Sequence, residues 1–127
     1  MPRTNVQRDS RSPEKVALTK ATVRAAAKLG INSRTLGAVI GLSQPTISRM
    51  KNGEFTLERG HKSFELGVLF VRLYRSLDAM VSGDERVAKE WLKNPNVALR
   101  DVPLNLIQHV AGLVNVIQYL DSRRARI

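Results

Sequence analysis

A cluster of polar residues between positions 43 and 51 has the types and spacing needed for contact with nucleic acid. In the helix that this segment predicts, Ile47 and Met50 point inward, so the polar residues take the opposite side. Arginine suits the paired acceptors of guanine, and glutamine suits adenine. The residues placed to reach base edges are Gln44, Thr46 and Arg49. The residues placed for phosphate oxygens, which fix register without reading sequence, are Arg34, Ser43 and Lys51.

Residues 33–53 predict the two short helices and the tight turn that would carry these side chains. Ser33 is expected to cap the first helix, Gly41 to adopt the left-handed conformation of the turn, and Ser43 to cap the second helix. Gly37 is expected where the two helices pass closest, because a larger side chain would hold their backbones apart. This is the layout of a helix-turn-helix, whose second helix lies in the DNA major groove. An ordinary solvated helical hairpin is the alternative, but the spacing of turn, cap and inward apolar residues favours the helix-turn-helix.

The positive charge of the chain is concentrated on the same half. The net charge is +10, and residues 1–64 hold 12 Lys and Arg against 4 Asp and Glu, whereas residues 65–120 hold 6 of each. Attraction to phosphates favours this distribution. Residues 1–12 are polar and basic without a hydrophobic period, which predicts a flexible arm that is either solvated or in contact with the DNA minor groove.

The rest of the chain predicts further helices. Ser12-Pro13-Glu14 is expected to start a helix that Gly30 ends, and its expected inner face is Val16, Thr19, Lys20, Val23, Ala26, Ala27 and Leu29. A long helix is expected from about Glu58 to Met80. Asp84 is expected to cap a helix that ends near Lys93 and buries Val87, Ala88, Trp91 and Leu92. Val102-Pro103 opens the last helical segments, and no segment alternates with period two. The predicted fold class is therefore all-α, with an N-terminal helix-turn-helix followed by a C-terminal helical bundle.

No group of residues in the sequence supports catalysis. The chain has no cysteine, which removes thiolate ligands, thiol chemistry and disulfides. His61 and His109 have no Cys, Asp or Glu at ligand spacing in a repeated motif, so a surface or capping role is expected for each. No phosphate-binding glycine loop or nucleophile elbow occurs. We expect a protein that is not an enzyme and needs no metal or cofactor.

Nothing in the sequence predicts contact with a membrane. No stretch approaches the roughly 20 apolar residues that a membrane-spanning helix needs. The residues after Met1 lack the apolar run of a secretory signal. A cytoplasmic location is therefore expected.

A second motif lies in the C-terminal half. It consists of Glu90-Trp91-Leu92-Lys93-Asn94-Pro95-Asn96, then Ala98-Leu99, Val102-Pro103-Leu104, Gly112 and Val116. Trp91 suits an anchor between helices, Pro103 a helix start, and Gly112 a close helix crossing. Together with the helix-turn-helix, this pattern resembles the MbcA/ParS/Xre antitoxin family over residues from about 15 to 122.

The resemblance implies a type II antitoxin. Members of that family are similar in being dimers that bind a RES-domain toxin, an enzyme that degrades NAD, and that repress their own operon through operator DNA. This chain departs from the family pattern in two places. Pro45 takes the place of a small polar contact residue at the first turn of the recognition helix, and the end of the chain, Asp121–Ile127, lacks the glycine-bearing tail of many relatives.

The basic end of the chain motivates a hypothesis about the toxin. A tail with three arginines could occupy the entrance of a toxin pocket that binds a dinucleotide with two phosphates. The residues expected to bind the toxin are Arg123, Arg124, Arg126 and Ile127. A solvated basic tail is the alternative.

Apolar residues in excess of a small bundle's needs predict a homodimer, within a larger toxin–antitoxin complex. They are Val68, Val71, Leu113, Val116 and Leu120. The expected division is an arm over residues 1–12, a DNA-binding domain over 13–57, a dimerisation and toxin-binding domain over 58–122 and a basic tail over 123–127. The alternative function is that of a stand-alone dimeric helix-turn-helix transcriptional regulator without a toxin partner.

Overall fold

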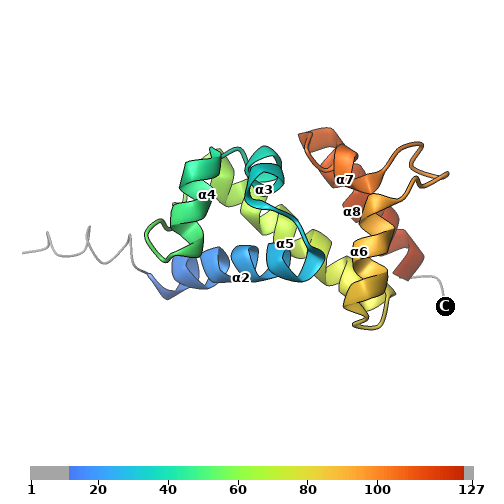
Figure 1. Cartoon of the computed structure of the whole chain (residues 1–127), viewed down its shortest axis with the longest axis horizontal. Helices are drawn as coiled ribbons and strands as arrows, with labels where there is room; N and C mark the ends of the chain where they lie inside the picture. The colour runs from blue at the N-terminus through green and yellow to red at the C-terminus, as the bar shows by residue number, and fades with distance from the viewer. Residues whose placement is uncertain (1–11, 125–127) are drawn as a thin grey trace, which may run out of the picture.

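The computed structural model describes residues 12–124, which form seven α-helices and contain no β-strand. The helices are α2 (Pro13–Leu29), α3 (Ser33–Ile40), α4 (Gln44–Lys51), α5 (Lys62–Met80), α6 (Glu85–Lys93), α7 (Pro103–Leu106) and α8 (Val110–Arg124). The predicted all-α class, with a helix-turn-helix followed by further helices, is confirmed. Helices α2, α3 and α4 occupy one end of the molecule, α6, α7 and α8 occupy the other, and α5 runs from one end to the other (Figure 1). Nearly all of the predicted arm over residues 1–12 lies outside the described residues.

Helix α2 begins and ends at the predicted residues. The hydroxyl of Ser12 accepts a hydrogen bond from the backbone N–H of Lys15 at 3.4 Å, and Pro13 is the first helical residue. Gly30 ends the helix in the left-handed conformation, with φ of 69°.

The buried face of α2 is only partly the expected one, because Thr19, Ala26 and Leu29 are buried and the other four expected residues are not. Its buried residues are Lys15, Thr19, Thr22, Ala25, Ala26 and Leu29, whereas Val16, Lys20, Val23 and Ala27 are half-buried or exposed. The two threonines can be buried because each hydroxyl donates to a carbonyl one turn earlier in the helix, at 2.8 Å. The Thr19 hydroxyl also accepts the backbone N–H of Leu57 at 3.0 Å. Sequence periodicity placed Thr19 on the inner face of the helix, but it gave no sign of the partner of Thr19, which lies 38 residues away.

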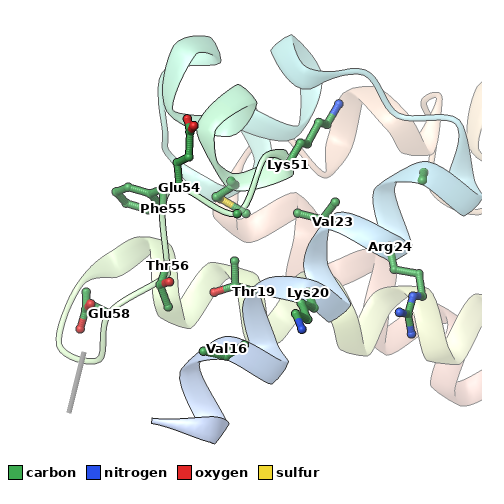
Figure 2. Close-up of a pocket in the computed structure, with 13 residues that line it drawn as sticks. Val16, Thr19, Lys20, Val23, Arg24, Lys51, Glu54, Phe55, Thr56 and Glu58 are labelled. Carbon is green, nitrogen blue, oxygen red and sulfur yellow. The ribbon is translucent and has the colours of Figure 1, made fainter. Parts of the chain in front are cut away.

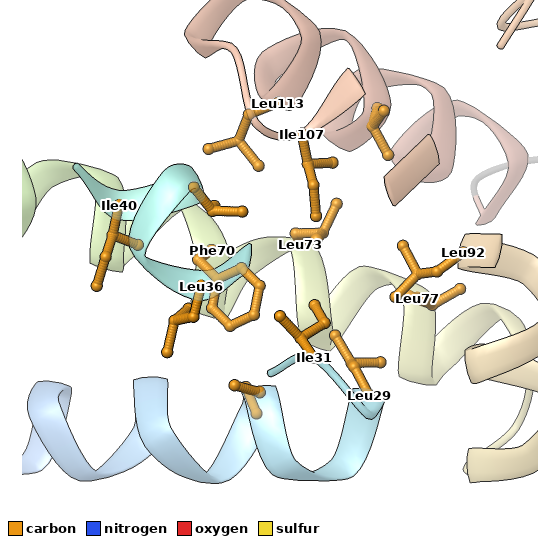
Figure 3. Packing of buried hydrophobic residues seen from close by; sticks show 14 of the residues in the cluster. Leu29, Ile31, Leu36, Ile40, Phe70, Leu73, Leu77, Leu92, Ile107 and Leu113 are labelled. Atoms are coloured by element: carbon orange, nitrogen blue, oxygen red, sulfur yellow. The ribbon is translucent and has the colours of Figure 1, made fainter. Parts of the chain in front are cut away.

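Helix α5 provides the centre of the core. It packs against α2 and α3 from the N-terminal half of the chain and against α6 and α8 from the C-terminal half. Phe70, Leu73 and Leu77 are fully buried along it. Around them gather side chains from both ends of the molecule, as Figure 3 shows: Leu29, Ile31, Leu36, Ile40, Leu92, Ile107 and Leu113. One hydrophobic core therefore serves both halves of the chain.

The predicted start of the long helix at Glu58 is wrong by four residues. Gly60 has φ of 89°, a left-handed conformation that cannot continue into a helix, and α5 begins only at Lys62. The segment before it is tied to α2 instead. The Glu58 carboxylate lies 2.8 Å from the ammonium of Lys15, whose side chain is 10% exposed.

Most of the apolar residues on which the homodimer prediction rested are buried within the chain. Leu113, Val116 and Leu120 have no exposed surface, and Val71 is buried too. They are buried because α8 packs along α5, where Asp121 also accepts hydrogen bonds from Arg72 at 2.9 Å and Ser76 at 2.6 Å. Of the five residues, only Val68 is exposed. The prediction that these residues form a surplus apolar surface is wrong.

We expect Thr19→Val to lower the free energy of unfolding by about 1–3 kcal/mol, because the buried N–H of Leu57 would lose its acceptor. Thr22→Val is the matched control, since Thr22 is also buried on α2 but its hydroxyl bonds only within the helix. Urea unfolding followed by circular dichroism measures both. Equal losses in the two variants would show that the link to Leu57 contributes nothing.

Candidate functional site

The turn between α3 and α4 has the predicted geometry. Gly41 ends α3 with φ of 77°, and the backbone N–H groups of Gly41 and Leu42 both donate to the carbonyl of Gly37, at 2.8 and 3.0 Å. Ser43 then caps α4, and its hydroxyl accepts the N–H of Thr46 at 3.3 Å. The expected glycine turn and serine cap are confirmed.

Gly37 allows α3 to approach this turn closely. A Cβ at this position would lie 2.4 Å from the carbonyl oxygen of Leu42 and 3.6 Å from Cγ1 of Ile47. The first distance is impossible for real atoms, so any side chain would push the turn away from α3. The need for a small residue is confirmed, although the nearest obstacle is the backbone of the turn and not the recognition helix itself.

The expected cap of α3 is wrong by one residue. Asn32 caps the helix, with its side-chain oxygen accepting the N–H of Thr35 at 2.8 Å, and Ser33 is the first helical residue. The Ser33 hydroxyl accepts a hydrogen bond from the ammonium of Lys51 at 2.6 Å. This bond joins the end of α4 to the start of α3.

The six residues predicted to contact DNA lie on the accessible surface of α3 and α4. Ile47 and Met50 are buried at 0% and 3% exposure, which turns the opposite side of α4 to solvent. Thr46 is half-buried, and the other five are exposed: Arg34, Ser43, Gln44, Arg49 and Lys51.

Three of these residues form a hydrogen-bonded row along one face of α4. The hydroxyls of Ser43 and Thr46 lie 2.9 Å apart, and the guanidinium of Arg49 donates to the Thr46 hydroxyl at 3.2 Å. The spacing of three residues between neighbours brings them together on a helix. Thr46, predicted to reach bases, therefore also holds Arg49, and this positioning lowers the conformational entropy that the arginine loses on binding.

A groove lies between α2 and the segment that leaves α4 (Figure 2). Its volume is about 950 Å³, and its lining includes the α2 residues that were expected in the core: Val16, Lys20, Val23 and Ala27. Met50 and Lys51 contribute from α4, so the groove shares Lys51 with the predicted DNA-binding residues. Its charged groups are mixed, with Lys20 and Arg24 on α2 and Glu54 and Glu58 on the segment after α4.

The C-terminal half presents a second surface, on α6 and α8. Trp91 is half-buried and stacks on Tyr119 with ring centroids 6.3 Å apart, and the guanidinium of Arg123 lies 6.0 Å from the centroid of Tyr119. Val87 is 36% exposed. The expectation that α6 buries Val87 is wrong, whereas Ala88 and Leu92 are buried as expected and Trp91 packs against the core as a partly buried residue. The side chain of Arg124, and the whole of Arg126 and Ile127, lie outside the described residues.

The described part of the chain offers no obvious metal centre. Within residues 12–124 no three His, Asp or Glu side chains gather in a way that would hold a metal ion. His61 and His109 are both exposed. No helix among these residues is long and apolar enough to cross a membrane.

Two family models match the chain, one on each half. Residues 7–72 match the antitoxin Xre-like helix-turn-helix domain. Residues 76–126 match the antitoxin Xre/MbcA/ParS C-terminal toxin-binding domain. No curated protein matches the chain. Both matches extend into α5, the helix that the two halves share.

We expect Arg49→Ala to weaken specific DNA binding by about 1–3 kcal/mol and to relax discrimination at one base pair. Lys51→Ala should weaken binding to all DNA sequences alike. It should also flatten the dependence of affinity on salt, because the variant loses a phosphate contact that releases counterions. Fluorescence anisotropy with operator and mutated operator duplexes, at several salt concentrations, separates the two effects. Wild-type binding by both variants would contradict the assignment of α4 as the recognition helix.

We expect Thr46→Val to reproduce part of the Arg49→Ala defect, since valine keeps the shape of threonine but cannot accept the bond from Arg49. In a double-mutant cycle, the sum of the losses in binding free energy of the two single variants should exceed the loss of the double variant. Strictly additive losses would mean that Thr46 does not act through Arg49. Ser48→Ala, an exposed change on the same helix, is the control.

Proposed function

The chain belongs to the family of antitoxins with an Xre-like helix-turn-helix domain, and on that premise we propose that it neutralises a RES-domain, NAD-degrading toxin and represses its own operon. It is an antitoxin of a toxin–antitoxin system with a DNA-binding helix-turn-helix. The observation that best supports the proposal is the presence of two separate surfaces in one chain, the polar face of α4 and the aromatic surface of α6 and α8. We propose a role in binding alone, in the cytoplasm, with no cofactor and no reaction catalysed.

Operator recognition is assigned to residues 13–57. Gln44, Thr46 and Arg49 would contact bases, while Arg34, Ser43 and Lys51 would contact phosphates. The exposure of these side chains and the positive charge of this half of the chain support the assignment. Residues 1–12 would serve as a basic arm.

Dimerisation and toxin binding are assigned to residues 58–122, with the toxin contacts placed from residue 76 onward, where the toxin-binding match begins, and in the tail over 123–127. The last turn of α8 is fixed to α5 through Asp121, and Arg123 lies against Tyr119, so the tail starts from a defined place on the surface. We propose that Arg123, Arg124, Arg126 and Ile127 occupy the entrance of the NAD pocket of the toxin. A pocket that attracts anions would repel arginine. Pairing with acidic residues at the rim of the pocket would still hold the arginines at its entrance.

A homodimer within a larger complex with the toxin is also part of the proposal. Its support is that a two-fold protein matches a palindromic operator. The interface has to come from surfaces other than the buried residues of α8, because those residues already pack on α5.

The decisive experiment is co-expression with the RES-domain protein encoded by the adjacent reading frame, followed by co-purification and an assay of NAD hydrolysis. We expect a stable complex in which hydrolysis is suppressed. Without such a reading frame, or without a complex, the chain would be a stand-alone regulator that represses transcription and binds no toxin.

The same assay tests the tail. Deletion of residues 123–127 should leave the complex intact but restore at least about a tenth of the NAD hydrolysis rate, because the pocket would be open. A triple change of Arg123, Arg124 and Arg126 to Lys keeps the charge and is the control. Full protection of NAD by the truncated chain would contradict the proposed place of the tail.

A further inference from the structure

A small hollow lies between α6 and the loop that follows it. Its volume is about 300 Å³. Three of its lining residues are apolar, namely Val87, Trp91 and Pro95. Its other lining residues are polar: Glu90, Asn94 and Asn96. Protein–protein contacts combine apolar and polar groups in this way.

Val97, the next residue after the lining Asn96, is 95% exposed. Among the described residues, four large apolar side chains are exposed: Val68, Val87, Val97 and Val110. Val97 is by far the most exposed of them, and Val87 belongs to the hollow itself. Single exposed apolar residues are common on proteins, but Val87 lines this hollow and Val97 directly follows one of its lining residues.

The loop that carries Val97 is held rigidly by its own hydrogen bonds. Asn96 and Asp101 face each other across it, with the N–H of Asn96 donating to the carbonyl of Asp101 at 3.0 Å. The side-chain oxygen of Asn96 accepts the N–H of Leu99 at 3.0 Å, and the backbone carbonyl of Asn96 accepts the N–H of Arg100 at 2.7 Å. Leu99 packs against the core as a partly buried residue. The loop therefore holds Val97 in solvent in a defined position, so Val97 would lose little conformational entropy on binding a partner.

Two ring contacts link the hollow to the start of the basic tail. Trp91 forms part of its wall and also stacks on Tyr119, which in turn lies beneath Arg123. The whole row lies within residues 76–126, the part of the chain that matches a toxin-binding domain. The position of this row within the toxin-binding match is the reason to expect a toxin as the partner that covers the hollow.

We propose that the hollow and Val97 form an apolar anchor for the toxin, distinct in action from the basic tail. This inference rests on the proposed function. An aliphatic or aromatic side chain of the RES-domain protein fills the hollow, and Val97 inserts into the surface of the toxin. The anchor supplies affinity, whereas the tail supplies inhibition. Because the anchor is apolar, its contribution is insensitive to salt, while the contribution of the tail is screened.

The test compares Val97→Asp with Val68→Asp in the full chain. Both valines are exposed, but Val68 lies on α5 outside the toxin-binding match. The probe is the RES-domain protein identified as the partner by co-purification, and the measurement is the dissociation rate and Kd by surface plasmon resonance. Val97→Asp should raise Kd by about 30-fold or more, as expected at the centre of an interface, and Val68→Asp by less than about 3-fold. Both variants should keep the wild-type Tm and operator affinity.

The outcomes separate the two levels of the proposal. If the wild-type chain binds the toxin and Val97→Asp binds equally well, the anchor is wrong and the antitoxin function stands. If the wild-type chain does not bind the RES-domain protein, the proposed function fails and the anchor fails with it. A loss in Val97→Asp that disappears in high salt would also overturn an apolar anchor, because it would indicate repulsion by the new charge alone.

Discussion

Both proposed binding surfaces depend on the burial of α5 by helices from both halves of the chain. Phe70, Leu73 and Leu77 lie in one core to which the helix-turn-helix contributes Leu36 and Ile40 and the C-terminal helices contribute Ile107 and Leu113. Protein interiors are close-packed and transmit small shifts. The surface on α4 and the surface on α6 and α8 are therefore held at a fixed separation, by a helix that neither half could lose without exposing its own core.

The two surfaces are built by opposite physical means. On α4, hydroxyls and a guanidinium are joined in a row by hydrogen bonds, so polar groups are pre-positioned for a charged and hydrated partner. On the other half, a rigid loop and a stacked aromatic pair hold apolar groups in solvent. The first kind of surface suits a polyanion, for which affinity depends on salt. The second suits a protein, where burial of apolar area dominates.

Features that depend on neighbouring residues were predictable from the sequence. The cap at Ser12, the turn at Gly41 and the caps at Ser43 and Asp84 each depend on a bond that spans about three residues. The outward face of α4 was also predictable, since two inward residues set it. The faces of α2, α6 and α8 were predictable only in part, because apolar residues on several sides of a helix do not indicate which side its neighbours will cover. The bond from Lys51 to Ser33, between groups 18 residues apart, carries no local signal either.

By itself, the sequence determined that the chain is helical, where most helices begin and end, and which side of the recognition helix meets solvent. These outcomes follow from backbone geometry and short-range hydrogen bonds, which act before the chain is compact. Only the tertiary structure decided that Leu113, Val116 and Leu120 belong to the core while Val97 stays in water. Burial depends on how the helices pack against one another. Because α8 packs against α5, it buries the apolar face that the sequence alone had assigned to contact with a second copy of the chain.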